Sequence, residues 1–144
     1  MKFTKMHGIG NDYIYIDCFK QDIPDPEYLA RVMSPRRTSV GSDGVILICP
    51  SEVADAKMRM FNLDGSEGKM CGNGIRCVGK YVYDKGYTEK TELAVETLSG
   101  IRYLNLHVSD GKVDSVSVDM GEAIVSEAVK LSALGEEYSC HPVN

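Results

Sequence analysis

The spacing of apolar residues changes along the chain between a repeat of two, typical of strands, and a repeat of about 3.6, typical of helices. Four early stretches have the composition or the alternation of strands, and they cover residues 1–6, 13–19, 45–49 and 57–62. Asp25 followed by Pro26 is a typical helix start and predicts a short helix that ends near Met33, before Pro35. Residues 36–44 are rich in Ser and Gly and predict a loop.

The longest helical pattern begins at Cys71. Apolar and small residues recur there at the spacing of one helix face, at Ile75, Val78, Gly79 and Val82. Charged residues form the opposite stripe, at Arg76, Lys80 and Asp84. Lys85 suits the negative end of the helix dipole, and Gly86 suits the left-handed position after the last turn. We therefore expect a largely buried helix that starts at Cys71 and ends near Lys85.

Three more strands are predicted after this helix, over residues 92–97, 102–108 and 113–120. Ser99-Gly100 and Asp110-Gly111 lie between them and are typical of hairpin turns. Short connections favour an antiparallel or mixed sheet, so we expect an α+β fold whose sheet wraps on one central helix. The pattern contains no linker, repeat or low-complexity tract, and residues 1–144 are therefore expected to form a single domain.

Composition agrees with one globular domain, since 43% of the 144 residues are hydrophobic and 26% are charged. The 21 acidic and 16 basic residues leave a net charge of −5, so we expect no nucleic-acid partner. No apolar run reaches the ~18 residues that a membrane-spanning helix needs. The N-terminal residues also lack the apolar core of a secretory signal, and we expect no membrane association.

The five cysteines are odd in number and contain no Cys-x-x-Cys pair, which argues against a disulfide framework and a zinc site. Free thiols are typical of a reducing compartment, so we expect a cytoplasmic protein. Cys18 and Cys49 lie in apolar runs, and we expect both in the core. Cys77 follows Cys71 by six residues on one helix, too far for a disulfide, and is also expected in the core.

The segment around Cys71 is the richest in candidate chemistry. Cys71 stands where the long helix begins, and Gly72, Asn73 and Gly74 leave the backbone bare behind it. The free N–H groups of a helix start can bind a carboxylate and can stabilise a thiolate beside it. A glycine-rich helix start with a buried cysteine explains the same residues without function. From this segment alone, both interpretations stay open.

Two asparagines are further candidates for ligand contacts. Asn11 follows Gly8-Ile9-Gly10 in a bare loop between two predicted strands, and its amide can both donate and accept hydrogen bonds. Asn62 stands at the end of a predicted strand. Asparagine also favours turns, and this simpler role explains either residue equally well. The three histidines are scattered along the chain, and we expect no metal site.

Taken together, five segments resemble the diaminopimelate epimerase family: KMHGIGNDYIYID, SVGSDGVILI, MRMFNLDGSEGKMCGNGIRC, VETLSGI and VDMGEA. The resemblance implies a fold of two similar halves, each a curled sheet around a central helix, with the active site between them. Residues 1–144 then correspond to the N-terminal half. The C-terminal half, with a second helix and its own cysteine, is the partner that this chain is expected to need, and the family suggests a homodimer.

The resemblance further implies interconversion of L,L- and meso-diaminopimelate, a step toward lysine and peptidoglycan, with neither pyridoxal phosphate nor a metal. Two cysteines do this chemistry in the family, and Cys71 matches the first of them. Gly72 and Asn73 match the backbone that holds the α-carboxylate, and Asn11 and Asn62 match asparagines that contact substrate. Position 44 is glycine here, whereas some members carry a substrate-contacting glutamine, so this contact does not carry over.

Three alternatives remain on sequence grounds. Another cofactor-independent isomerase of the same fold would use the same helix start. A thiol-nucleophile enzyme would need a histidine paired with Cys71, and no such pairing is recognisable. A non-catalytic amino-acid-binding module would bind a carboxylate without turning it over. With only one of the two cysteines, residues 1–144 alone are expected to be inactive.

Overall fold

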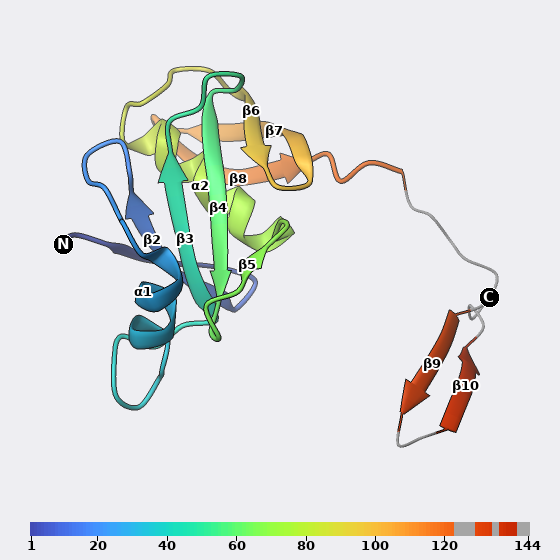
Figure 1. Ribbon diagram of the computed structural model, residues 1–144. Helices are drawn as coiled ribbons and strands as arrows, with labels where there is room; N and C mark the ends of the chain where they lie inside the picture. Colours follow the sequence, from blue (N-terminus) through green and yellow to red (C-terminus); the bar gives the residue numbers. More distant parts are fainter. Residues whose placement is uncertain (123–128, 134–135, 141–144) are drawn as a thin grey trace.

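The computed structural model describes residues 1–122, 129–133 and 136–140 (Figure 1). Its elements are β1 (Thr4–Gly8), β2 (Asn11–Asp17), α1 (Pro26–Met33), β3 (Gly44–Cys49), β4 (Ala56–Asn62), β5 (Glu67–Gly68), α2 (Gly72–Asp84), β6 (Glu92–Thr97), β7 (Gly100–Ser109), β8 (Lys112–Val118), β9 (Val129–Ala133) and β10 (Glu136–Cys140). No helix among the described residues is long and apolar enough to cross a membrane.

Eight strands form one mixed sheet in the order β1-β2-β3-β4-β6-β7-β8, with the short β5 paired to β4. Two pairs, β2 with β3 and β4 with β6, are parallel, and the other pairs are antiparallel. Each parallel pair needs a crossover, and each crossover contains one of the two helices. Within the part of the chain that the structure describes, strands β9 and β10 pair only with each other, in a second, two-stranded sheet.

The sheet separates two hydrophobic clusters. Helix α2 lies on the concave side and contacts strands from both ends of the sheet, including β1 and β8 (Figure 1). Its cluster is the larger one and contains Tyr15, Ile46, Ile75 and Val78. Helix α1 covers the other side over β3 and β4 with a smaller cluster. The expected α+β fold, a curled sheet around one central helix, is therefore confirmed.

Local chemistry explains where the two helices begin and end. The Asp25 carboxylate accepts a hydrogen bond from the Tyr28 N–H at 2.9 Å, so it caps α1, and Pro26 occupies the first helical position. Helix α2 ends at Asp84 with Lys85 as its C-cap, and Gly86 follows with a φ of +73° that only glycine adopts easily. The Tyr87 N–H returns to the Val82 carbonyl at 2.9 Å. The start of α1 and the end of α2 agree with the sequence prediction.

Helix α2 packs closely on β7 because one position on it lacks a side chain. A Cβ at Gly79 would lie 2.9 Å from Leu104 Cδ2 and 3.0 Å from Leu106 Cδ2. These leucines point inward from β7 and are almost fully buried. Gly79 thus determines how near the helix axis can lie to the sheet.

Several predicted boundaries need correction. The first strand begins at Thr4 rather than at residue 1, and β8 ends at Val118 rather than at residue 120. The hairpin at Asp110-Gly111 is confirmed, with φ of +50° and +74°. In the other hairpin Thr97 pairs with Gly100, so Leu98 and Ser99 form the turn. The short β5 and the β9–β10 pair carry no strong periodic pattern and were not predicted.

Candidate active site

Cys71 lies directly before α2 and acts as its N-cap. Its backbone is extended, with φ −129° and ψ 114°, and its sulfur accepts a hydrogen bond from the Gly74 N–H at 3.3 Å. The Cys71 carbonyl accepts the Ile75 N–H at 2.9 Å. The thiol is half-buried, so it is both fixed by the helix start and accessible from outside. The predicted position of Cys71 at the start of the long helix is therefore confirmed.

The next two residues of the helix start, Gly72 and Asn73, each carry a backbone N–H group. Among the residues that the structure describes, none accepts a hydrogen bond from the Gly72 or Asn73 N–H. The Asn73 side chain instead accepts a hydrogen bond from Arg76 Nη2 at 2.7 Å, which holds this turn in place. Two such groups beside the positive end of a helix dipole suit a carboxylate.

Asn11 meets Cys71 although 60 positions separate them in the sequence. The Cys71 thiol donates a hydrogen bond to Asn11 Oδ1 at 3.3 Å. Asn11 Nδ2 donates to Asp43 Oδ2 at 2.7 Å, and this second contact determines which way the amide faces. Asn11 therefore does not form the turn that the sequence left open. Ile9 and Gly10 do so, with φ of +54° and +81°.

Close packing of bare backbone brings the Asn11 loop to the helix. A Cβ at Gly8 would lie 2.7 Å from the Asn73 carbonyl oxygen, so β1 reaches the first turn of α2 only because residue 8 is glycine. The absence of a side chain at Gly8 thus brings the two motifs into direct contact.

A cluster of charged side chains stabilises the loop that carries Asn11. Arg36 contacts the carboxylates of Asp12 at 2.5 Å and Asp43 at 2.7 Å, and Lys5 contacts Asp12 at 2.7 Å. Asp43 Oδ2 also accepts the Asp12 backbone N–H at 3.0 Å. Hydrogen bonds from the Arg36 guanidinium, and then from Lys5, hold the pKa of Asp12 well below its usual value, despite partial burial.

Tyr13 is a site residue that the sequence analysis did not identify. It lies two residues after Asn11 on β2, so both side chains point to the same face, and only 6% of it is exposed. Burial and then the neighbouring Cys71 thiol raise the pKa of Tyr13 to about 12, so its hydroxyl stays protonated beside the sulfur. Alternation along β2 from Asn11 is the signal that could have found it.

Asn62 and Gly44 lie at the edge of this group. They face each other across β3 and β4, and the Asn62 amide donates to Ser66 Oγ at 3.0 Å within a turn. A Cβ at Gly44 would overlap the Phe61 carbonyl and would lie 3.1 Å from Tyr13 Cε1. Backbone and the Tyr13 ring therefore fill the space that a larger side chain at residue 44 would need. No hydrogen bond joins Asn62 to Cys71 among the described residues.

The other cysteines divide into two kinds. Cys77 is buried, with 8% of it exposed, as expected for a core residue. Cys18 and Cys49 are only half-buried, so the expectation that both belong to the core is corrected: they lie at the rim of the cluster under α1. All these thiols and Cys71 are free.

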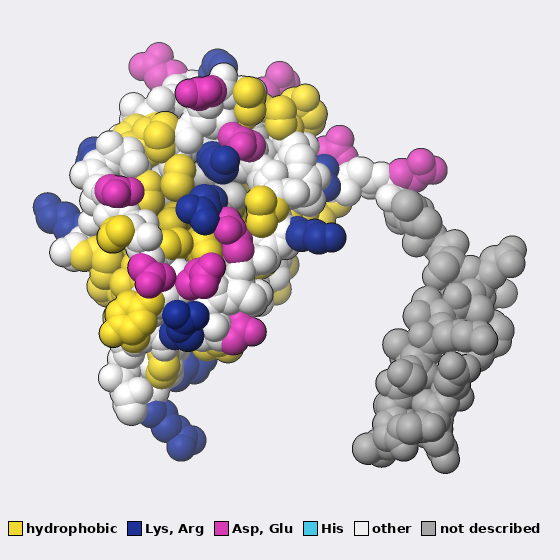
Figure 2. All heavy atoms as spheres, in the orientation of Figure 1, with side chains coloured by type: hydrophobic (Ala, Val, Ile, Leu, Met, Phe, Trp, Pro, Cys, Tyr) yellow, Lys and Arg dark blue, Asp and Glu magenta, His cyan; other side chains and the backbone are white. Residues whose placement is uncertain are grey.

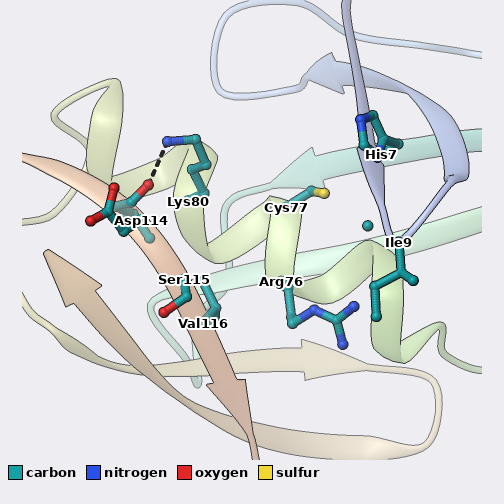
Figure 3. Close-up of a pocket in the computed structure, with 10 residues that line it drawn as sticks. His7, Ile9, Arg76, Cys77, Lys80, Asp114, Ser115 and Val116 are labelled. Atoms are coloured by element: carbon teal, nitrogen blue, oxygen red, sulfur yellow. Dashed lines mark hydrogen bonds between the residues drawn. The ribbon is translucent and has the colours of Figure 1, made fainter.

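One cavity of about 360 Å³ lies along the flank of α2, between the β1 end and β8. Figure 3 shows Arg76, Cys77 and Lys80 facing it from the helix, with His7 and Ile9 opposite. Lys80 Nζ donates to the Val113 carbonyl at 2.6 Å, which ties α2 to β8. Cys71 does not line this cavity, so the candidate site is the open helix start rather than the hollow. Among the described residues, no three His, Cys, Asp or Glu side chains are grouped for a metal ion.

Comparison with known proteins finds matches to one family at high identity. A family model described as diaminopimelate epimerase matches residues 3–126. The chain is 55% identical over 144 residues to the diaminopimelate epimerase of Acetivibrio thermocellus, covering 99% of this chain and 51% of that protein. It is 56% identical over 143 residues to that of Methanococcus maripaludis, covering 99% of this chain and 50% of that protein. The chain thus spans about half the length of the curated relatives it matches.

Solved structures share the fold at lower identity. A probable proline racemase from Agrobacterium radiobacter superposes with a TM-score of 0.71 at 21% identity, covering 92% of this chain and 45% of that one. A hydroxyproline epimerase from Agrobacterium vitis also gives 0.71 at 21% identity, covering 95% and 46%. These likenesses concern the fold alone. From the family match, the identities and the helix-start cysteine, the chain belongs to the diaminopimelate epimerase family.

Proposed function

We propose that residues 1–144 form the N-terminal half of an epimerase that interconverts L,L- and meso-diaminopimelate without a cofactor. Cys71 is the acid or base on one face of the substrate α-carbon. The observation that carries the proposal is the Cys71 sulfur at the N-cap of α2, 3.3 Å from the Gly74 N–H and 3.3 Å from Asn11 Oδ1. This geometry lies within the segment that matches the family model.

The chemistry requires such a helix start. Removal of an α-proton without an electron sink places negative charge on the carboxylate in the transition state. The Gly72 and Asn73 N–H groups are positioned to meet this charge at the positive end of α2. A sulfur next to these donors can then take or deliver the proton while the carboxylate stays bound.

Inversion needs a second group on the opposite face, because a single base returns the proton to the side it left. We assign this group to a cysteine in the C-terminal half, which also supplies the rest of the substrate pocket. Asn11 and Asn62 would then contact the substrate from this half, and the complete enzyme would be a homodimer in the cytoplasm. Residues 1–144 alone would bind substrate weakly and would not epimerise it.

Reconstitution tests this proposal directly. Residues 1–144 are mixed with the separately produced C-terminal half of the Acetivibrio thermocellus relative, and each diastereomer of diaminopimelate is offered in heavy water. We expect solvent deuterium at the α-carbon and formation of the other diastereomer, with neither half active alone. Proline and hydroxyproline serve as control substrates, since their turnover would indicate a different isomerase of this fold.

A chimera provides the matched control for failed assembly. It joins residues 1–144 to the same C-terminal half in one chain, and its Cys71→Ala variant is measured beside it. Loss of activity in the variant supports the assignment of Cys71. A folded chimera that binds diaminopimelate without exchange of the α-proton would overturn the proposal and favour a binding module.

A further inference from the structure

Cys18 and Cys49 are neighbours across the parallel pair of β2 and β3. In this pair Asp17 lies opposite Ile48, and the Cys18 N–H continues the ladder by donating to the Ile48 carbonyl at 2.8 Å. This hydrogen bond places Cys18 opposite Cys49. Opposite residues of adjacent strands point to the same face, and both cysteines pack on the rim of the α1 cluster. The two thiols, 31 positions apart in sequence, therefore face each other.

The spacing of adjacent strands suits a covalent bond between them. Neighbouring strands lie about 4.8 Å apart, within the roughly 4.4–6.8 Å between Cα atoms that a disulfide spans. Both side chains are partly exposed, so a small reagent can reach them. Cys71 and Cys77, in contrast, lie six residues apart on one helix and cannot meet.

The surroundings give the two thiols different roles. Cys49 on β3 has Cys18 beside it on the β2 side and Lys57 beside it on the β4 side, where Lys57 is the residue that pairs with Cys49. The adjacent Cys18 thiol, supported by the charges of Arg59 and Lys57, lowers the pKa of Cys49 against the effects of burial and Glu67. The adjacent Cys49, burial and the charges of Asp17 and Asp22 raise the pKa of Cys18. Cys49 is therefore the nucleophile and Cys18 the resolving thiol.

The two cysteines lie at the rim of the cluster that α1 covers, and side chains of both charges surround this rim. Acidic and basic side chains alternate over β3 and β4 in Figure 2. Lys57 forms an ion pair with Glu96 at 2.9 Å, and Arg59 forms one with Glu67 at 2.8 Å. Both cations therefore remain at this surface. A polar, charged disulfide of small size can approach such a face.

We propose that Cys18 and Cys49 form a dithiol site that small-molecule disulfides of the glutathione type oxidise reversibly. The Cys49 thiolate attacks one sulfur of the reagent, whose disulfide bond breaks and releases one thiolate. The Cys18 thiol loses its proton and attacks the Cys49 sulfur, which releases the second reagent thiol. The two protein thiols lose two electrons and two protons, and the reagent gains them as two thiols. This inference is independent of the proposed epimerase activity.

Peptide mapping tests the site on the chain as it exists. The reduced chain is incubated with glutathione disulfide, quenched in acid and digested, and the peptides are identified by mass. We expect a cross-linked pair of peptides that contain Cys18 and Cys49, and a rise in Tm because the bond closes the loop around α1. The same incubation in denaturant is expected to abolish the preference for this pair.

Single variants separate the two steps. In Cys18→Ser the Cys49–glutathione adduct is expected to accumulate, whereas in the unchanged chain it is resolved and stays below about one-tenth of the product. In Cys49→Ser adduct formation at Cys18 is expected to be at least about tenfold slower. Cys71→Ser should leave the cross-link intact. A native chain that forms adducts at Cys71 but no Cys18–Cys49 cross-link would overturn the proposal.

Discussion

At the scale of single residues, the proposed function depends on what surrounds one sulfur atom. Cys71 accepts a hydrogen bond from the Gly74 N–H and donates one to Asn11. The first hydrogen bond stabilises the thiolate, and the second stabilises the thiol. An acid–base group that alternates between the two forms needs partners for each. Cys77, six residues later, packs in the core and has no such surroundings.

Replacement of Cys71 tests this difference. In the reconstituted enzyme, Cys71→Ala is expected to lower α-proton exchange by about 10²–10⁴-fold or more, and Cys71→Ser nearly as much, because a hydroxyl is a far weaker acid. Cys77→Ala is the control and should keep activity at a cost of roughly 1 kcal/mol in the free energy of unfolding. Exchange in heavy water at the unchanged rate in Cys71→Ala would contradict the role of Cys71.

Asp43 is expected to act on Cys71 through Asn11. Asp43→Ala removes the acceptor of Asn11 Nδ2, so the amide can turn and donate to the sulfur instead. The net free energy of one hydrogen bond corresponds to a change in rate of about two- to tenfold. Alkylation of Cys71 by iodoacetamide at neutral pH should therefore accelerate by this factor. Asp12→Ala removes the same charge without touching the Asn11 amide, and should change the rate much less.

A double variant completes this test. If Asp43 acts through Asn11, Asp43→Ala should have little further effect on alkylation once Asn11→Ala is present. An equal acceleration in both backgrounds would mean that only the charge of Asp43 matters.

At the scale of elements, the structure depends on how loops and helices are held against strands. The loop before β3 is attached to β1 and β2 through the carboxylates of Asp12 and Asp43. Helix α2 is attached to β7 through contact at Gly79. The first attachment is electrostatic and depends on pH, whereas the second is steric and does not.

The Asp12 cluster predicts a pH dependence of stability. Because the folded-state pKa of Asp12 lies below its unfolded value, its ion pairs stabilise the fold above the ordinary aspartate pKa. This contribution is lost as the pH falls below that value. Asp12→Asn should therefore lower Tm at pH 7, and this deficit should shrink progressively as the pH falls below about 4 toward the depressed pKa of Asp12. Glu52→Gln, at an exposed position, should leave Tm unchanged, and an equal Asp12→Asn deficit at all pH values would contradict the argument.

Gly79 predicts a steric limit at the α2–β7 contact. Gly79→Leu should destabilise the fold by about 1–3 kcal/mol or more, because Leu104 and Leu106 already fill the space. Gly79→Ala should lie near zero, since a gain of roughly 1 kcal/mol in helix propensity offsets a contact with flexible leucine ends. Denaturant unfolding measures both. A Gly79→Leu variant as stable as Gly79→Ala would show that the helix can move away from the sheet.

At the scale of the whole molecule, residues 1–122 contain both helices and every strand of the eight-stranded sheet. A chain that ends at Glu122 should therefore unfold in one cooperative transition, with an enthalpy of ~0.7 kcal/mol per residue near 60 °C. Its Tm should match that of residues 1–144, because β9 and β10 pair only with each other. Calorimetry of both chains gives the comparison, and a broad transition without an enthalpy peak would contradict it.

Elements with local causes were predictable from the sequence. The start of α1 at Asp25-Pro26, the start of α2 at Cys71 and the turn at Asp110-Gly111 were each predicted where the structure has them. Each depends on a cap, a proline or a positive φ that a few adjacent residues determine. The resemblance to a known family added the overall shape of the sheet and helix.

Residues that meet from distant positions were not predictable in the same way. Local patterns are enough to predict that Cys71 begins a helix and that Asn11 follows a bare loop. Folding in three dimensions is needed to bring Asn11 Oδ1 within hydrogen-bond distance of the Cys71 thiol, to place Tyr13 beside it and to set Cys18 opposite Cys49. Strand order and parallel crossovers set these contacts, and they follow from packing across the whole chain rather than from the local preferences that a sequence pattern expresses.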